Sequence, residues 1–152
     1  MGNDASLHLI ADLKDLPAIH KFINDRAVSL GVDPLTVYDV HLVVTEMVSN
    51  TIIHGYQGVP GPVEIEMGRE GDSLVIRLRD KTPPFDPTQM PPPDLSTPLD
   101  ERPVGGLGIH LTRNFVDRFE YRYSVQTGNE ITLVKEGVFS NSSREEDDGH
   151  GC

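Results

Sequence analysis

The sequence has a single cysteine, no tryptophan and few basic residues. Cys152 is the last residue, so the chain offers neither a disulfide framework nor a cysteine-based zinc site. No apolar run approaches the roughly 18 residues that a membrane span needs. The N-terminus also lacks the basic and then apolar pattern of a signal peptide. We therefore expect a protein of the reducing cytoplasm that makes no membrane contact.

The shortage of basic residues also argues against a nucleic-acid partner. Lys and Arg number 13 against 24 Asp and Glu, which gives a formal net charge of -11. Nucleic acids and anionic membranes both require basic patches. The acidic excess is not only a tail effect, because residues 141–152 contain just four of the acidic side chains. A chain of 152 residues suits one domain that meets a protein partner.

Hydrophobic periodicity predicts an α/β (α+β) two-layer sandwich. The expected order is a strand at 6–11, helices at 16–30 and 34–54, strands at 63–67 and 74–79, a helix from about 106, and strands at 118–125 and 130–135. Gly31 and Gly55 should end the first two helices, and Asp33 should cap the second. This order predicts a mixed, largely antiparallel sheet with its helices on one face.

Two segments fall outside this pattern. Residues 82–103 contain eight of the twelve prolines and show no helical or strand period. Such a long irregular stretch inside a compact domain is typical of a lid or binding loop, here at about 82–104, although a plain linker is the alternative. The acidic, Ser- and Gly-rich residues 138–152 are expected to form a disordered tail behind a domain of residues 1–137.

The helix expected at 34–54 carries a polar face. Glu46, Asn50 and His54 lie at i, i+4 and i+8, so their side chains should stack along one side of an otherwise apolar helix. Polar groups in such surroundings need partners. A Mg²⁺ ion with its waters and a nucleotide's phosphates would supply them. The alternative is that all three are ordinary solvated or structural residues.

Two further elements point to a nucleotide. The expected third helix begins with three glycines, Gly105, Gly106 and Gly108. Free N–H groups and the helix dipole at such a helix start attract anions. The alternative is that these glycines only form the turn before the helix. Asp80 follows a strand and precedes the proline-rich loop. A carboxylate there could accept a hydrogen bond from the amino group of adenine, or it could simply initiate a turn.

The three elements together resemble the N, G1 and G2 boxes of the GHKL ATPases, which share the Bergerat fold. Within that superfamily the chain is most similar to the bacterial anti-sigma-factor serine/threonine-protein kinases. Four stretches carry the resemblance, which covers roughly residues 6–136: Glu46 to Tyr56, Asp80 to Pro87, Gly105 to Gly108, and Gly128 to Lys135.

The resemblance implies a role for each matching residue. It implies that Asn50 ligates Mg²⁺, that Glu46 is the general base, and that Asp80 binds the adenine amine. It further implies that ATP is held by the following residues: Gly105, Gly106, Leu107 and Gly108 at the phosphates, Thr132 on the adenine side, and His54 at the end of the pocket.

One residue departs from the family pattern. Thr82 occupies a position, two residues after the G1 aspartate, where the family usually has glycine. A β-branched residue restricts the backbone there, so adenine is expected to sit differently or to bind more weakly.

The resemblance implies an ATP- and Mg²⁺-dependent kinase that acts as an anti-sigma factor and forms a homodimer. Its substrate would be a serine or threonine of a small anti-anti-sigma protein, which competes with a sigma factor and is released once phosphorylated. The alternative is a non-catalytic ATP-binding module that only holds its partner; Thr82 favours the module and Glu46 favours the enzyme. The six histidines are scattered, which argues against a metal-binding structural domain.

Overall fold

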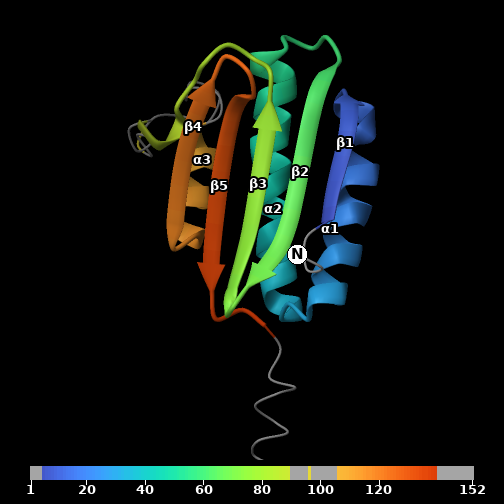
Figure 1. Ribbon diagram of the computed structural model, residues 1–152, viewed down its shortest axis with the longest axis vertical. Coiled ribbons are helices and arrows are strands. Elements are labelled where there is room, and N and C mark those ends of the chain that lie inside the picture. Colours follow the sequence, from blue (N-terminus) through green and yellow to red (C-terminus); the bar gives the residue numbers. More distant parts are fainter. Residues whose placement is uncertain (1–4, 90–95, 97–105, 140–152) are drawn as a thin grey trace, which may run out of the picture.

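A five-stranded sheet carries three α-helices on one of its faces (Figure 1). The structure, a computed structural model, describes residues 5–89, 96 and 106–139. The main elements of this part of the chain are β1 (Ala5–Ala11), α1 (Leu16–Leu30), α2 (Pro34–Asn50), β2 (Gly61–Glu70), β3 (Ser73–Asp80), α3 (Gly106–Phe115), β4 (Arg118–Ser124) and β5 (Gly128–Glu136). The predicted two-layer α+β sandwich is confirmed.

The strand order is β1-β2-β3-β5-β4, and every described pairing is antiparallel. The sheet is therefore antiparallel throughout rather than mixed. The connections explain this: two consecutive helices, α1 and α2, return the chain to the end of the sheet where β1 finished, so β2 runs opposite to β1 (Figure 1). The helix α3 makes β4 parallel to β3, but β5 lies between these two strands.

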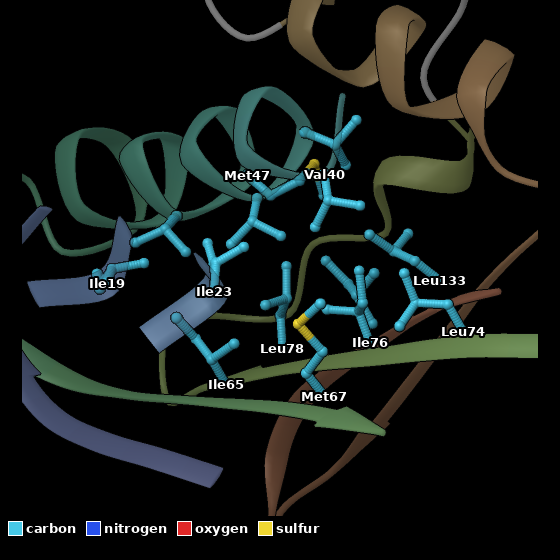
Figure 2. Close-up of a cluster of buried hydrophobic side chains, with 14 of the residues drawn as sticks. Ile19, Ile23, Val40, Met47, Ile65, Met67, Leu74, Ile76, Leu78 and Leu133 are labelled. Carbon is cyan, nitrogen blue, oxygen red and sulfur yellow. The ribbon is translucent and has the colours of Figure 1, made fainter. Parts of the chain in front are cut away.

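The core lies between the sheet and the helices. Strand side chains alternate between faces, and the inward set meets the apolar stripes of α1 and α2. Figure 2 shows Ile19, Ile23, Val40 and Met47 from the helices above Ile65, Met67, Leu74, Ile76, Leu78 and Leu133 from the strands. Burying each such side chain contributes about 1.5–3 kcal/mol, so this layer fixes α2 firmly on the sheet.

The helix boundaries agree with the sequence for α1 and differ for α2. Gly31 ends α1 with φ 82°, as expected. Asp33 begins α2 through its backbone carbonyl, which accepts from Thr36 and Val37, and its side chain makes no capping bond. The α-helix ends at Asn50, because residues Thr51–Gly55 form a π turn. The helical run thus ends at Gly55, close to the expected end near His54, but its last five residues form a π turn instead of continuing the α-helix, which periodicity cannot reveal.

The packed region extends two residues beyond the expected boundary at 137. Val138 and Phe139 are buried, and the Val138 carbonyl accepts a 2.7 Å hydrogen bond from the Asp33 N–H. Phe139 bridges to Val32 and packs its ring under the Arg69 guanidinium. Residues 140–152, which hold the rest of the expected tail, lie outside the described residues.

The first part of the expected lid is anchored to the fold. Arg113 of α3 donates to the carbonyls of Pro87 and Thr88 at 3.3 and 2.8 Å, and Asp86 accepts from the N–H of Thr88. Of the remaining segment to residue 104, only Ser96 is among the described residues. No helix in the described part of the chain is long and apolar enough to cross a membrane.

Candidate functional site

A cavity of about 490 Å³ lies at the end of the sheet where β3 finishes, a volume typical of small-ligand sites. In Figure 1 this is the upper end, where α2 passes into its π turn and the loop after β3 begins. The cavity is lined by Met47, Asn50, Thr51, His54, Gly55, Gln57, Asp80, Thr82, Pro83, Pro84, Phe85, Pro87, Ile109, Asn129 and Ile131. The cavity thus lies where three elements meet: the end of α2, the loop that follows Asp80, and α3.

Asn50 is the last residue of α2 and one of the cavity's polar groups. Its Nδ2 is buried and has no hydrogen-bond partner among the described residues. A buried N–H donor without a protein partner is costly, which indicates an acceptor atom such as a phosphate oxygen and not a cation at Nδ2. The amide oxygen suits Mg²⁺, which commonly takes few protein ligands. Within residues 5–89, 96 and 106–139, no cluster of three His, Cys, Asp or Glu side chains competes for a metal.

Glu46 lies one turn before Asn50 and is half-buried against α3. A β-carbon added at Gly108 would lie 2.6 Å from Glu46 Oε1. Gly108 therefore allows α3 to lie close to α2, and a larger residue there would displace the Glu46 side chain. The sequence pattern predicts a phosphate contact for this glycine; the structure adds a packing reason for it.

Gly106, Leu107 and Gly108 form the first turn of α3, while Gly105 lies outside the described residues. The first N–H groups of a helix lack intrahelical partners. Ile109, in the same turn, lines the cavity. This turn therefore meets the cavity through Ile109, while Gly108 lies against Glu46, which does not line the cavity.

The residues after α2 close the other end of the cavity. His54 lines it and is exposed. Tyr56 packs its ring on Gly61, donates to the Pro62 carbonyl at 2.6 Å, and accepts from the Lys81 N–H at 2.8 Å. Burial raises the pKa of the Tyr56 hydroxyl, so it remains a donor. Tyr56 thus ties the start of β2 to the end of β3 beside Asp80.

Asp80 presents its carboxylate to the cavity with its two oxygens in different environments. Oδ1 accepts from the Thr82 N–H at 2.9 Å and the Thr82 hydroxyl at 2.6 Å. Oδ2 has a 3.5 Å contact with the Thr51 hydroxyl. Thr82 itself is buried, and its methyl group occupies the space beside Gly55. Thr82, at the position where the family pattern has glycine, is thus packed and hydrogen-bonded. The sequence did not predict these contacts.

Thr132 does not belong to this site, so its predicted contact with adenine is wrong. It pairs with Arg77 and Glu120, and it lies in a hollow on the opposite face of the sheet with these two residues. Strand alternation explains the error: Ile131 and Leu133 face the core, so the residue between them faces away.

Asn129 is the site residue that sequence reasoning missed. It is 3% exposed, lines the cavity, and donates from Nδ2 to Asp80 Oδ1 at 2.9 Å. It follows a turn glycine, Gly128, where an asparagine is unremarkable. The available signal was the strand register, since Asn129 shares the inward parity of Ile131.

Comparison with known proteins gives the family of the chain. The family model of the histidine kinase-like ATPase domain matches residues 9–135. An anti-sigma F factor from Anoxybacillus flavithermus is 32% identical over 104 residues, covering 68% of this chain and 70% of the relative. A similar factor from Clostridium kluyveri is 31% identical over 111 residues, covering 73% and 75%.

More distant relatives have kinase names. The serine-protein kinase RsbW of Bacillus cereus is 29% identical over 83 residues, which is 52% of each chain. A crystal structure of the RsbU and RsbW domains of a Mycobacterium tuberculosis protein has a TM-score of 0.57 at 17% identity, covering 87% of this chain and 32% of that longer one. The last likeness shows the fold alone. The chain belongs to the family of histidine kinase-like ATPase domains, in the branch that includes the anti-sigma F factors.

Proposed function

We propose that this protein is an ATP-dependent serine/threonine-protein kinase that acts as an anti-sigma factor. Its substrate would be a hydroxyl of a small anti-anti-sigma protein, and its other partner a sigma factor. The observation that carries the proposal is the cavity lined by both Asn50 and Asp80, with Glu46 one helical turn away against α3. Relatives named anti-sigma F factor and serine-protein kinase RsbW support it.

Different residues of the site would bind different parts of the nucleotide. Asp80 Oδ2 would accept a hydrogen bond from the amino group of adenine, because Oδ1 is already occupied. The first N–H groups of α3, at Gly106 and Gly108, would hold phosphate oxygens. Asn50 would hold Mg²⁺ through its amide oxygen, and this ion would neutralise phosphate charge.

Transfer would require little covalent chemistry from the protein. The acceptor hydroxyl oxygen forms a bond to the γ-phosphorus, the bond from that phosphorus to the β,γ-bridging oxygen breaks, and ADP leaves. Glu46 would accept the hydroxyl proton, a role that typically contributes about 10²–10⁴ in rate. Its contact with Gly108 limits where the carboxylate can lie.

The experiment is transfer of labelled phosphate. The protein is incubated with γ-labelled ATP, Mg²⁺ and a candidate anti-anti-sigma protein, and the acceptor is analysed for phosphoserine and phosphothreonine. We expect labelled acceptor that no longer binds the kinase. An acceptor that binds but is never labelled would indicate the non-catalytic module instead. We also propose a homodimer, which sedimentation equilibrium would detect.

A further inference from the structure

The side chain of Asn129 joins two parts of the site that are separate in sequence. In the sheet it pairs with Asp80 at the end of β3. Its Nδ2 donates to Asp80 Oδ1 at 2.9 Å and to the Thr82 carbonyl at 3.0 Å, and it also lies 3.3 Å from the Pro83 carbonyl. Its Oδ1 accepts from the N–H of Phe85 at 3.3 Å.

A third strand fixes which way this carboxamide points. The Tyr121 hydroxyl of β4 donates to Asn129 Oδ1 and also accepts from the Phe85 N–H at 3.2 Å. Burial raises the pKa of Tyr121, so its hydroxyl stays protonated. Turning the amide over would set its NH₂ against two donors and its oxygen against a carboxylate and two carbonyls. The orientation of Asn129 is therefore determined.

This orientation has a consequence for Asp80. Asn129 and both donors of Thr82 converge on Oδ1, whereas Oδ2 has only a long contact with Thr51. Three donors on one oxygen fix the plane of the carboxylate and leave the lone pairs of the other oxygen for the cavity. An acceptor held in this way favours a ligand that offers an amino group over one that offers a carbonyl oxygen at the same position.

We propose that Asn129 is a positioning residue for nucleobase recognition: it fixes Asp80 with Oδ2 toward the cavity and connects this arrangement to the start of the proline-rich segment. The inference rests on the proposed function, since it supposes that a nucleotide occupies the cavity. Phe85, which lines the cavity, is held by the same amide through its backbone. Preference for adenine over guanine would thus depend on Asn129 although it acts through Asp80.

The test measures ATP and GTP affinities by calorimetry with Mg²⁺ for the full chain. Asn129→Ala removes one donor to a carboxylate, so we expect ATP affinity to fall roughly tenfold. GTP affinity should change less, which lowers the ATP-to-GTP ratio. The reference variant is Asp80→Asn, which should lower the same ratio. The matched control is Asn24→Ala on the exposed side of α1, which should change neither affinity.

Two further variants separate positioning from simple destabilisation. Tyr121→Phe removes only the hydroxyl that orients the amide, and should lower the ratio in the same direction by a smaller factor. Asn129→Asp sets a second carboxylate beside Asp80. Its ATP-to-GTP ratio should recover as the pH is lowered from about 8 to about 5.5, because a shared proton then restores a donor. A change in packing alone would not depend on pH in this way.

The outcomes are distinct. An unchanged ATP-to-GTP ratio in folded Asn129→Ala and in Tyr121→Phe would overturn the inference while leaving the kinase proposal intact. If Asn129→Ala does not fold, Tyr121→Phe and Asn129→Asp decide the question. Wild-type protein that binds neither nucleotide would overturn the proposed function and this inference together.

Discussion

Glu46 and Gly108 touch where α2 and α3 meet: a β-carbon at position 108 would lie 2.6 Å from Glu46 Oε1 and 3.0 Å from Glu46 Cβ. Real β-carbon contacts are essentially never shorter than 3.0 Å. The missing side chain therefore allows α3 to approach the carboxylate proposed as the base, and an added methyl group would displace that carboxylate. Gly108 thus affects both the packing of α3 on α2 and the position of the Glu46 carboxylate.

Gly108→Ala should reduce phosphoryl transfer by at least about tenfold, because the added methyl group must displace Glu46 or α3, and small displacements in a site are costly. Alanine favours a helix over glycine by about 1 kcal/mol, so the loss should not come from α3 unwinding. Transfer kinetics and circular dichroism measure the two effects. Asn114→Ala, near the C-terminal end of α3, is the control and should retain full transfer.

Asn50→Ala should abolish the dependence of ATP binding on Mg²⁺. The variant removes the proposed ligand oxygen and also the Nδ2 atom that is buried without a described partner, so thermal stability should stay equal or rise. Calorimetry with and without Mg²⁺ gives the affinity. Asn24→Ala serves as the helix control. If ATP affinity with Mg²⁺ is unchanged in Asn50→Ala, Asn50 does not hold the metal.

Thr82 is predicted to support the site rather than to obstruct it. Its hydroxyl donates to Asp80 Oδ1, and its methyl group fills the space beside Gly55. Thr82→Ser keeps the hydroxyl and should retain most ATP affinity. Thr82→Gly loses both contacts and should bind ATP several-fold more weakly, with a melting temperature lower by a few degrees. Equal or stronger binding by Thr82→Gly would instead show that the threonine impedes the nucleotide, as the family pattern suggests.

Local sequence patterns predicted the helices and strands well. They predicted less well which strand residues face the cavity and which face away from it. The order of strands and helices, the glycine that ends α1 and the two β-hairpins could all be derived from periodicity and turn residues. Facing the cavity or facing away differs by a single residue of strand parity, so the register relative to Ile131, and not the residue type, separates Asn129 from Thr132. The π turn after Asn50 was equally hidden, since Ile52 and Ile53 continue the apolar pattern of the preceding helix.

The ion pairs on the sheet face opposite the described helices should make stability depend on pH. Glu130 loses solvent on burial, which opposes ionisation, but bonds from Arg79 at 2.7 Å and Arg122 at 2.9 Å outweigh this and lower its pKa. A carboxylate with a lowered pKa stabilises the fold above its ordinary pKa, near 4.5, and this contribution is lost as the pH falls further.

Glu130→Gln should therefore lower the free energy of unfolding by about 1 kcal/mol at neutral pH. The difference from wild type should shrink as the pH falls below about 4.5, because the wild-type carboxyl is then protonated as well. Urea unfolding at a series of pH values measures both quantities. Glu120→Gln, whose partner Arg118 is largely exposed, is the control and should have little effect at any pH. A difference that stays constant down to acidic pH would exclude the ion pairs as its cause.

Glu46→Gln separates a kinase from a binding module. Glutamine keeps the size of the side chain and its contact with Gly108, but it cannot accept a proton from the substrate hydroxyl. We expect Mg-ATP and partner affinities close to wild type and a transfer rate lower by about 10²–10⁴. Calorimetry and single-turnover labelling measure these separately. Undiminished transfer would remove Glu46 as the base while leaving the kinase assignment intact. Loss of ATP binding would mean that the carboxylate holds the nucleotide or its metal instead of acting on the acceptor.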